Sequence, residues 1–396
     1  MQMSERISGF QASPIRRLVP YANEAKQRGI KVYHLNIGQP DIKTPPQVID
    51  AVRGYSREII AYGQSEGDIE LRQALPVYYR SFGAEISTEN IMVTTGGSEA
   101  IQFALMTLCD PGDEVIVPEP YYTNVGSFAR GAMVTLVPVT SLLEEGFALP
   151  DIAQFEARIT PRTRAIMLCS PNNPTGHVYT EEELMQILEL VRRKDIFLIV
   201  DEVYREFCYD GKPFTSVLAY PEYADRVVVV DSFSKRYSMC GARIGALISK
   251  NPAVLEGAMK LAQARLCPPD IEQVAALAAL STPSEYLQEV QAEFQRRRDF
   301  LVQELRKIPG VTCSEPKGAF YLVARLPVED AEDFAIFLLK DFNLNGETVM
   351  VAPAEGFYVT PGLGRNEIRI AYVLNTADLE RAIGCLQAAL EAYRSK

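Results

Sequence analysis

The chain has 396 residues, of which 47% are hydrophobic and 23% are charged, and it carries a formal net charge of −11. These values predict a globular protein and disfavour nucleic acids and anionic membranes as partners. The seven cysteines form no CxxC pair, and there are two histidines, which argues against a disulfide scaffold or a metal centre. The N-terminus lacks the apolar core of a signal peptide, so we expect a cytoplasmic protein.

The first predicted elements form an N-terminal segment. Residues 13–29 have the spacing of a helix, and residues 32–38 predict a short strand that ends at Gly38. A glycine at that point lets the backbone approach a small ligand closely, although an ordinary turn would need one as well. Tyr62 follows in a loop, ahead of the next predicted helix.

Residues 90–110 predict a short strand, a tight turn and a helix. The turn, Thr-Thr-Gly-Gly-Ser, includes Gly97 and Ser98 and leaves backbone N–H groups free at the helix N-terminus. Such a terminus is suited to bind an anion. The stretch matches neither the dinucleotide fingerprint nor a P-loop. Taken alone, it is equally compatible with a plain strand-to-helix turn.

Strands and helices alternate from residue 114 to residue 207, which predicts a mostly parallel sheet with helices on both faces. Four of the predicted strands end in polar or glycine-rich stretches: TTGGS, SPNNPTG, DEVY and SFSK. Right-handed crossovers bring the ends of parallel strands to one edge of a sheet. We therefore expect these four stretches to meet at a ligand site.

The last of these strands, residues 227–232, leads into Ser-Phe-Ser-Lys, and Lys235 is the strongest candidate for chemistry. A lysine at the bottom of a crevice is partly desolvated. Desolvation lowers its pKa and frees the amine to act as a nucleophile. An isolated motif of this kind would more often hold an ordinary loop lysine, so the neighbouring strand ends carry the argument.

The C-terminal part is predicted to be helical from residue 252 to residue 307, with breaks at 265–270 and 282–283, and then a small α+β domain. We divide the chain into an N-terminal segment that joins the small domain (1–45), a large domain (46–282) and the C-terminal small domain (283–396).

The motifs SPNNPTG, DEVY, SFSK with Arg243, and RIAY, in this order, resemble those of the class I/II aminotransferases, which are pyridoxal-phosphate enzymes of fold type I. The resemblance runs from about residue 13 to the end. It implies an α/β fold with a mostly parallel sheet flanked by helices in a large cofactor-binding domain, plus a small α+β domain.

It also implies pyridoxal 5′-phosphate as the cofactor. The reaction would move an amino group between an L-amino acid, with aspartate-like substrates favoured, and a 2-oxo acid such as 2-oxoglutarate, by a ping-pong route.

The resemblance implies roles for single residues around the cofactor ring. Lys235 would form a Schiff base with the cofactor and later move a proton. Asp201 would pair with the pyridine nitrogen, which makes the ring an electron sink. Asn173 and Tyr204 would hydrogen-bond the ring's 3′ oxygen, and Tyr122 would stack on the ring face.

The phosphate group is expected on the backbone of Gly97 and Ser98, with Ser232 and Arg243 completing its cradle. Tyr62 matches a tyrosine that reaches the cofactor of the neighbouring subunit. The resemblance therefore implies a homodimer with shared active sites.

The substrate's α-carboxylate is expected on Arg369, with Asn173 and the backbone of Gly38 assisting. The cation for a second, side-chain carboxylate is open, because Ser98 stands where one aspartate-specific branch has a lysine. Arg265, from the partner subunit, is a candidate on account of its region and the Pro-Pro that follows. A surface arginine packed on a helix end would explain it equally well.

His177 and Cys240 lie beside the motifs, and we expect both to be packing residues. Two other functions are compatible with this fold. One is a different carbanion chemistry, such as that of a C–S β-lyase. The other is a non-catalytic regulator that binds pyridoxal phosphate, but such a regulator carries a DNA-binding domain, for which this acidic chain has no room.

Overall fold

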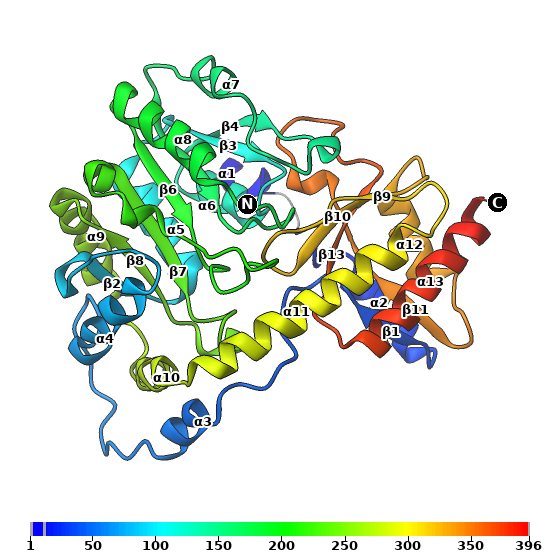
Figure 1. Cartoon of the computed structure of the whole chain (residues 1–396), viewed down its shortest axis with the longest axis horizontal. Coiled ribbons are helices and arrows are strands. Elements are labelled where there is room, and N and C mark those ends of the chain that lie inside the picture. Colours follow the sequence, from blue (N-terminus) through cyan, green and yellow to red (C-terminus); the bar gives the residue numbers. More distant parts are fainter. Residues whose placement is uncertain (1–2, 11–12, 395–396) are drawn as a thin grey trace.

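The computed structural model of the protein describes residues 3–10 and 13–394 (Figure 1). Residues 1–2, 11–12 and 395–396, which fall inside the predicted segments 1–45 and 283–396, lie outside the described residues. Within the described part, the largest sheet has seven strands in the order β2-β8-β7-β6-β5-β3-β4. The strands are β2 (Ile91–Thr94), β8 (Gly245–Ser249), β7 (Val227–Ser232), β6 (Phe197–Asp201), β5 (Thr163–Cys169), β3 (Glu114–Glu119) and β4 (Thr135–Thr140).

This sheet is parallel except for β8, which pairs antiparallel with both of its neighbours. The central strands are buried on both faces, and Val227 to Val230 are fully shielded from solvent. Such strands are the continuous apolar runs expected of a sheet covered on both sides. The predicted α/β fold with a mostly parallel sheet is therefore confirmed.

Helices cover both faces of the large sheet (Figure 1). One face packs against the helices α5 (Gly96–Leu108), α6 (Asn124–Gly131) and α9 (Pro252–Arg265). The other face packs against α4 (Ile69–Arg80), α8 (Glu181–Lys194) and α10 (Asp270–Leu280), with α3 (Pro46–Arg53) and α7 (Ile152–Glu156) at the periphery.

The C-terminal part is α+β, as the sequence predicts. Its antiparallel sheet has the order β12-β13-β10-β9, and β1 pairs in parallel with β11. The N-terminal segment contributes β1 (Lys31–His34) and α2 (Val19–Gln27). The C-terminal elements are β9 (Thr312–Cys313), β10 (Tyr321–Arg325), β11 (Glu347–Met350), β12 (Ala352–Pro353), β13 (Glu367–Ala371), α11 (Ser284–Leu305), α12 (Ala331–Lys340) and α13 (Thr376–Arg394).

The N-terminal segment packs with this C-terminal part, because Leu18 and Leu35 belong to the same hydrophobic core as α12 and α13. Helix α11 runs from α10 to the small sheet (Figure 1). These contacts support the predicted division at residues 45 and 282, which stays a prediction.

The predicted helix 13–29 is wrong at its start, since α2 begins at Val19 and residues 13–18 form turns and loop. Pro20 lies in the first turn of α2, where its missing N–H costs nothing. The breaks after Arg265 and before Ser284 are where the sequence predicts them. Among the described helices, none is long and apolar enough to cross a membrane.

Candidate active site

A cavity of about 240 Å³ opens where the carboxyl ends of β2, β5, β6 and β7 meet the small sheet. The convergence of the four polar strand ends is thus confirmed. Of the residues that the sequence singles out for the site, Tyr62 and Arg265 lie outside the cavity. Those that line it are Gly38, Gly97, Ser98, Tyr122, Asn173, Asp201, Tyr204, Ser232, Lys235, Arg243 and Arg369.

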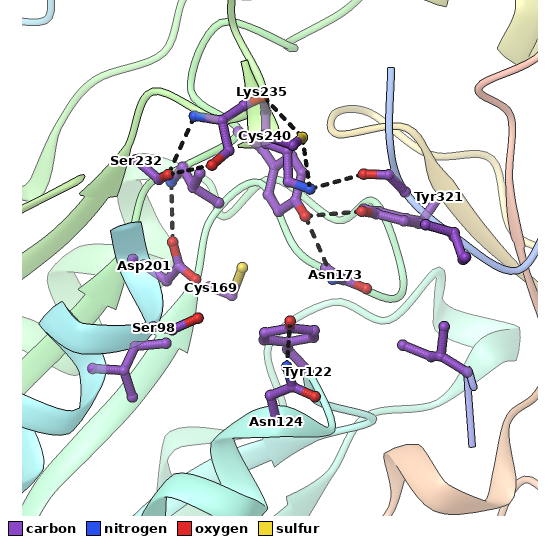
Figure 2. Close-up of a pocket in the computed structure, with 18 of the residues that line it drawn as sticks. Ser98, Tyr122, Asn124, Cys169, Asn173, Asp201, Ser232, Lys235, Cys240 and Tyr321 are labelled. Atoms are coloured by element: carbon purple, nitrogen blue, oxygen red, sulfur yellow. Dashed lines mark hydrogen bonds between the residues drawn. The ribbon is translucent and has the colours of Figure 1, made fainter. Parts of the chain in front are cut away.

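Lys235 lies in the turn after β7 and extends its amine into the cavity (Figure 2). Its Nζ donates a hydrogen bond to the carbonyl oxygen of Gly38 at 2.8 Å. Burial lowers the pKa of Lys235, and the positive charges of Arg369 and Arg243 lower it further. A lowered pKa makes the neutral amine, which is a nucleophile and a base, easier to form than in a lysine exposed to water.

Asp201 is the last residue of β6, and its Oδ1 accepts a hydrogen bond from the backbone N–H of Val203 at 3.1 Å. Burial raises the pKa of this carboxyl to about 7. A cation beside it would favour the ionised form. The protonated nitrogen of a pyridine ring would be such a cation.

An anion site lies at the N-terminus of α5. Thr95, which precedes this helix, makes no side-chain capping bond, and Gly97 and Ser98 of the first helical turn line the cavity. Arg243 lies directly against Gly96, where any side chain would collide with its guanidinium. Ser232 and Ser234 complete the rim, and Arg243 Nη1 lies 3.4 Å from Ser234 Oγ. Backbone N–H groups, hydroxyls and a guanidinium together suit a phosphate group.

Tyrosines and an asparagine form the walls between Lys235 and Asp201. The hydroxyl groups of Tyr204 and Tyr321 are 2.9 Å apart, and Asn173 Nδ2 lies 3.5 Å from Tyr204 Oη. Tyr122 lies across the cavity from Lys235, and Asn124 Nδ2 donates to its hydroxyl at 2.7 Å (Figure 2). These groups would offer hydrogen bonds to the edge of a bound flat ring, and Tyr122 would offer an aromatic face to it.

Arg369 comes from β13 and is 1% exposed. Its Nη1 donates to Asn173 Oδ1 at 3.2 Å, its Nη2 donates to the carbonyl oxygen of Asn36, and its Nε is buried without a hydrogen-bond partner. Among the described residues, no carboxylate forms an ion pair with it. Burial lowers its pKa. A guanidinium buried in this way calls for an anionic ligand, and a carboxylate fits its planar fork.

Tyr62 and Arg265 lie outside the cavity, in segments that contact each other through Ser65. Tyr62 is 81% exposed in the segment between α3 and α4. Arg265 Nη1 pairs with Glu99 at 3.0 Å, and its Nη2 donates to the carbonyl oxygen of Ser65 at 2.8 Å. Within one chain, Arg265 therefore ties the segment that carries Tyr62 to α5. A contribution of Arg265 to the active site of the partner subunit stays a prediction.

The sequence reasoning missed several residues of the cavity. Cys240 was expected to be a packing residue, but it lines the cavity, with its Sγ 3.9 Å from Lys235 Nζ, because the turn after Lys235 folds back on itself. Tyr321 and Arg16 also line it. Neither belongs to a motif, and Arg16 falls in the stretch that was predicted to be helical. His177 packs as expected, with its Nε2 3.2 Å from Glu183.

The donor set fits pyridoxal phosphate. The N-terminus of α5 with Arg243 suits the phosphate, the carboxyl of Asp201 suits the ring nitrogen, and the amine of Lys235 can attach to the aldehyde. Among the residues that the structure describes, no group of three histidine, cysteine or acidic side chains could hold a metal ion.

Comparisons with known proteins agree with this site. The family model "Aminotransferase class I and II" matches residues 30–386. The aspartate aminotransferase of Rhizobium meliloti is 33% identical, over 98% of this chain and 96% of that protein. A single mutant of the Thermus thermophilus aspartate aminotransferase superposes with a TM-score of 0.89 at 30% identity, over 98% of this chain and all of that one. The alanine aminotransferase of Pyrococcus furiosus also has a TM-score of 0.89, at 31% identity, over 99% of this chain and all of that one.

The family match covers most of the chain, and relatives and solved structures cover nearly all of it. The chain belongs to the class I and II aminotransferase family, and it is a pyridoxal-phosphate-dependent aminotransferase.

Proposed function

We propose that this aminotransferase moves the amino group between a dicarboxylic L-amino acid such as aspartate and a 2-oxo acid such as 2-oxoglutarate, as a cytoplasmic homodimer with shared active sites. The observation that carries the substrate class is the charge of the cavity. Among the described residues that line it, Arg16, Lys235, Arg243 and Arg369 are basic, and Asp201 is the acidic one.

Three of these basic groups have roles that do not require a second carboxylate on the substrate. Arg243 suits the cofactor's phosphate, Arg369 suits the α-carboxylate of the substrate, and Lys235 is the amine that reacts. Arg16 remains. It forms no ion pair with any residue that the structure describes, whereas the adjacent Arg17 pairs with Glu332. Arg16 is exposed at the mouth of the cavity, where a side-chain carboxylate of the substrate could reach it.

The relatives support this reading, but they do not decide it. Several curated relatives are named aspartate aminotransferases, and one from Aquifex aeolicus, 32% identical, is named a probable aspartate/prephenate aminotransferase. The Thermus enzyme has also been solved with maleate, a dicarboxylate. Yet the Pyrococcus alanine aminotransferase resembles this chain equally well in fold.

The proposed mechanism assigns each group one task. When bound, pyridoxal phosphate supplies an electron-withdrawing ring that stabilises negative charge at the substrate's Cα. Arg369 and Asn173 hold the α-carboxylate and thereby orient the Cα–H bond toward Lys235. The Lys235 amine takes the proton from Cα and returns a proton to complete each half of the ping-pong reaction. Asp201 keeps the ring nitrogen protonated.

The surface around Tyr62 supports the homodimer. Ile59 is 78% exposed, Ile60 is 64% exposed and Tyr62 is 81% exposed, all in one short segment. Large apolar side chains gathered on a surface mark a contact with another protein. A second copy of the chain would cover them and bring Tyr62 to the neighbouring cavity.

We expect Lys235→Ala to bind pyridoxal phosphate without covalent attachment and to lose nearly all turnover, because nucleophile and proton carrier disappear together. Borohydride reduction followed by peptide mass spectrometry measures the attachment. Lys317→Ala, which removes a lysine that does not line the cavity, is the control and should keep the label on Lys235. Label on another lysine of the wild-type chain would refute the assignment.

We expect the buried Asp201 to make the cofactor-free chain less stable as the pH rises. Its folded pKa, about 7, lies above the ordinary value of about 3.9, so the folded state binds the extra proton between these values. The free energy of unfolding should therefore fall as the pH rises across this window, and less so in Asp201→Asn. Urea denaturation at two pH values inside the window measures it. Asp210→Asn is the control, since its carboxyl has a pKa lowered to about 2 and is ionised throughout. Equal slopes in the wild type and Asp201→Asn would contradict the prediction.

We expect Tyr62 to form part of the active site of the partner subunit. Tyr62→Ala and Lys235→Ala homodimers should each be inactive or nearly so. After subunit exchange, their heterodimers combine an intact Lys235 in one chain with an intact Tyr62 in the other, and activity should return. Native mass spectrometry verifies the exchange. Exchange without recovery would show that each chain builds its site alone.

We expect Arg16→Ala to lower kcat/KM for aspartate and 2-oxoglutarate by about ten- to a hundredfold, the loss of one charged hydrogen bond, and to spare substrates with neutral side chains. Arg17→Ala is the matched control, since it removes the adjacent arginine, which is already paired with Glu332. Arg265→Ala tests the alternative cation. A selective loss in Arg265→Ala but not in Arg16→Ala would transfer the role to Arg265.

A further inference from the structure

A buried carboxylate lies beneath the active site and connects two of its segments. An arginine follows Tyr204 directly, and another follows Lys235. Both arginines point away from solvent, since Arg205 is 1% exposed and Arg236 is 0% exposed. They meet at Asp231, a residue of β7 that is also 0% exposed.

The two oxygens of Asp231 have four partners between them. Arg236 Nη1 donates to Oδ1 at 2.8 Å, and its Nη2 donates to Oδ2 at 3.2 Å. Arg205 Nη1 donates to Oδ2 at 3.3 Å, and the hydroxyl of Tyr79 donates to the same oxygen at 2.6 Å. The backbone N–H of Ser232 donates to Oδ1 at 2.7 Å. Each of these partners except Tyr79 belongs to a segment that also forms the cavity.

The surroundings of the two arginines hold them in place. Arg205 also forms an ion pair with the buried Glu202 at 3.2 Å, so two arginines face two carboxylates. The Cζ of Arg205 lies 4.3 Å from the ring centroid of Tyr79, and the Cζ of Arg236 lies 4.5 Å from that of Tyr78. Such stacking is favourable for a desolvated guanidinium. The cluster is thus balanced in charge and packed against α4.

Asp231 remains charged in this environment. Burial alone would raise the pKa of its carboxyl, but Arg205 and Arg236 outweigh burial and hold the pKa well below its usual range. A paired, ionised carboxylate fixes its partners more firmly than a neutral acid would, because charge-assisted hydrogen bonds are the stronger ones.

We infer that Asp231 is a positioning residue of the active site: through Arg236, Arg205 and the Ser232 N–H, it fixes the turns that carry Lys235, Tyr204 and Ser232 relative to one another. The inference rests on the proposed roles of Lys235 and Tyr204. Asp231 itself does not line the cavity. It acts by geometry, because proton transfer at the substrate's Cα requires the Lys235 amine at a defined place.

The cluster has two arms: Asp231 binds Arg236, next to Lys235, and it binds Arg205, next to Tyr204. Two variants separate the effects of these arms. Asp231→Asn has nearly the same shape and weakens both arms. Arg205→Met has a similar volume and removes the arm to Tyr204, while Arg236 keeps its bond to Asp231. Arg298→Met is the matched control, because Arg298 is also a buried arginine, pairs with Asp210 and lies 5.0 Å from the ring centroid of Tyr209, but neither lines the cavity nor contacts Asp231.

Two readouts follow, each at a temperature at which circular dichroism shows the variants to be folded. The first is the rate at which pyridoxal phosphate attaches to Lys235 of the cofactor-free chain, trapped with borohydride and counted by mass spectrometry. The second is kcat and KM with aspartate and 2-oxoglutarate. Should Asp231→Asn fail to fold, Tyr79→Phe, which removes one hydrogen bond to Asp231, takes its place with a smaller effect expected in the same direction.

We expect Asp231→Asn to slow attachment at Lys235 and to lower kcat by about a hundredfold, the effect of a misplaced group near the chemistry, with KM nearly unchanged because Arg369 is untouched. Arg205→Met should lower kcat while attachment keeps its wild-type rate. Arg298→Met should lower thermal stability and change neither. If Asp231→Asn changes attachment and kcat no more than Arg298→Met does, the inference is overturned. That result is distinct from failure of the proposed function, in which the wild-type chain itself would carry the label on another lysine.

Discussion

The active site depends on positive charge that is buried without a counter-charge from the protein. Arg369 is 1% exposed, its Nε lacks a partner, and two oxygen acceptors and the faces of Tyr321 and Phe357 hold the rest of it. An unpaired charge in such a place costs several kcal/mol of folding free energy, on the order of the cost measured when one partner of a buried pair is removed. An anionic ligand offsets this cost when it binds. The same feature that weakens the empty site therefore gives it affinity for carboxylates.

The scaffold keeps the buried, unpaired Arg369 apart from a second group of buried charges, which is balanced. Under the cavity, Asp231 and Glu202 neutralise Arg205 and Arg236, so that layer gains hydrogen bonds without a net charge. Above it, the cavity lining has an excess of positive groups. Val227 to Val230 belong to the same strand as Asp231 and Ser232 and are fully buried, and close packing on both faces leaves this strand little room to shift. Preorganised charge of this kind needs no reorganisation during the reaction.

The sequence predicts those parts of the site that follow directly from a strand end. Asp201 and Lys235 belong to the ends of apolar runs, and the topology of parallel strands brings such ends together whatever the side chains in between. Arg16 escaped prediction because helical spacing extends through residues 13–18, although the backbone there forms turns ahead of Pro20. The pairing of Arg205 and Arg236 with Asp231 is non-local in the sequence, and an arginine next to a site residue would ordinarily be taken for a solvated one. Cys240 was expected to be a packing residue and not part of the cavity, because the spacing of residues in the sequence does not determine how the turn after Lys235 folds.

The origin of the basic groups explains how substrate recognition is shared between the two parts of the molecule. Lys235 and Arg243 belong to the large sheet and its turns. Arg369 belongs to β13 of the small sheet, and Arg16 lies two residues from Leu18, which is buried in the core of the small sheet's helices. In the proposed function, the small sheet and the N-terminal segment thus bind both carboxylates of a dicarboxylic substrate. The large sheet places Lys235 beside its reacting carbon. Binding of the distal carboxylate would then help to place the reacting carbon beside Lys235. Binding energy used to position the reacting carbon in this way can appear in kcat as well as in KM.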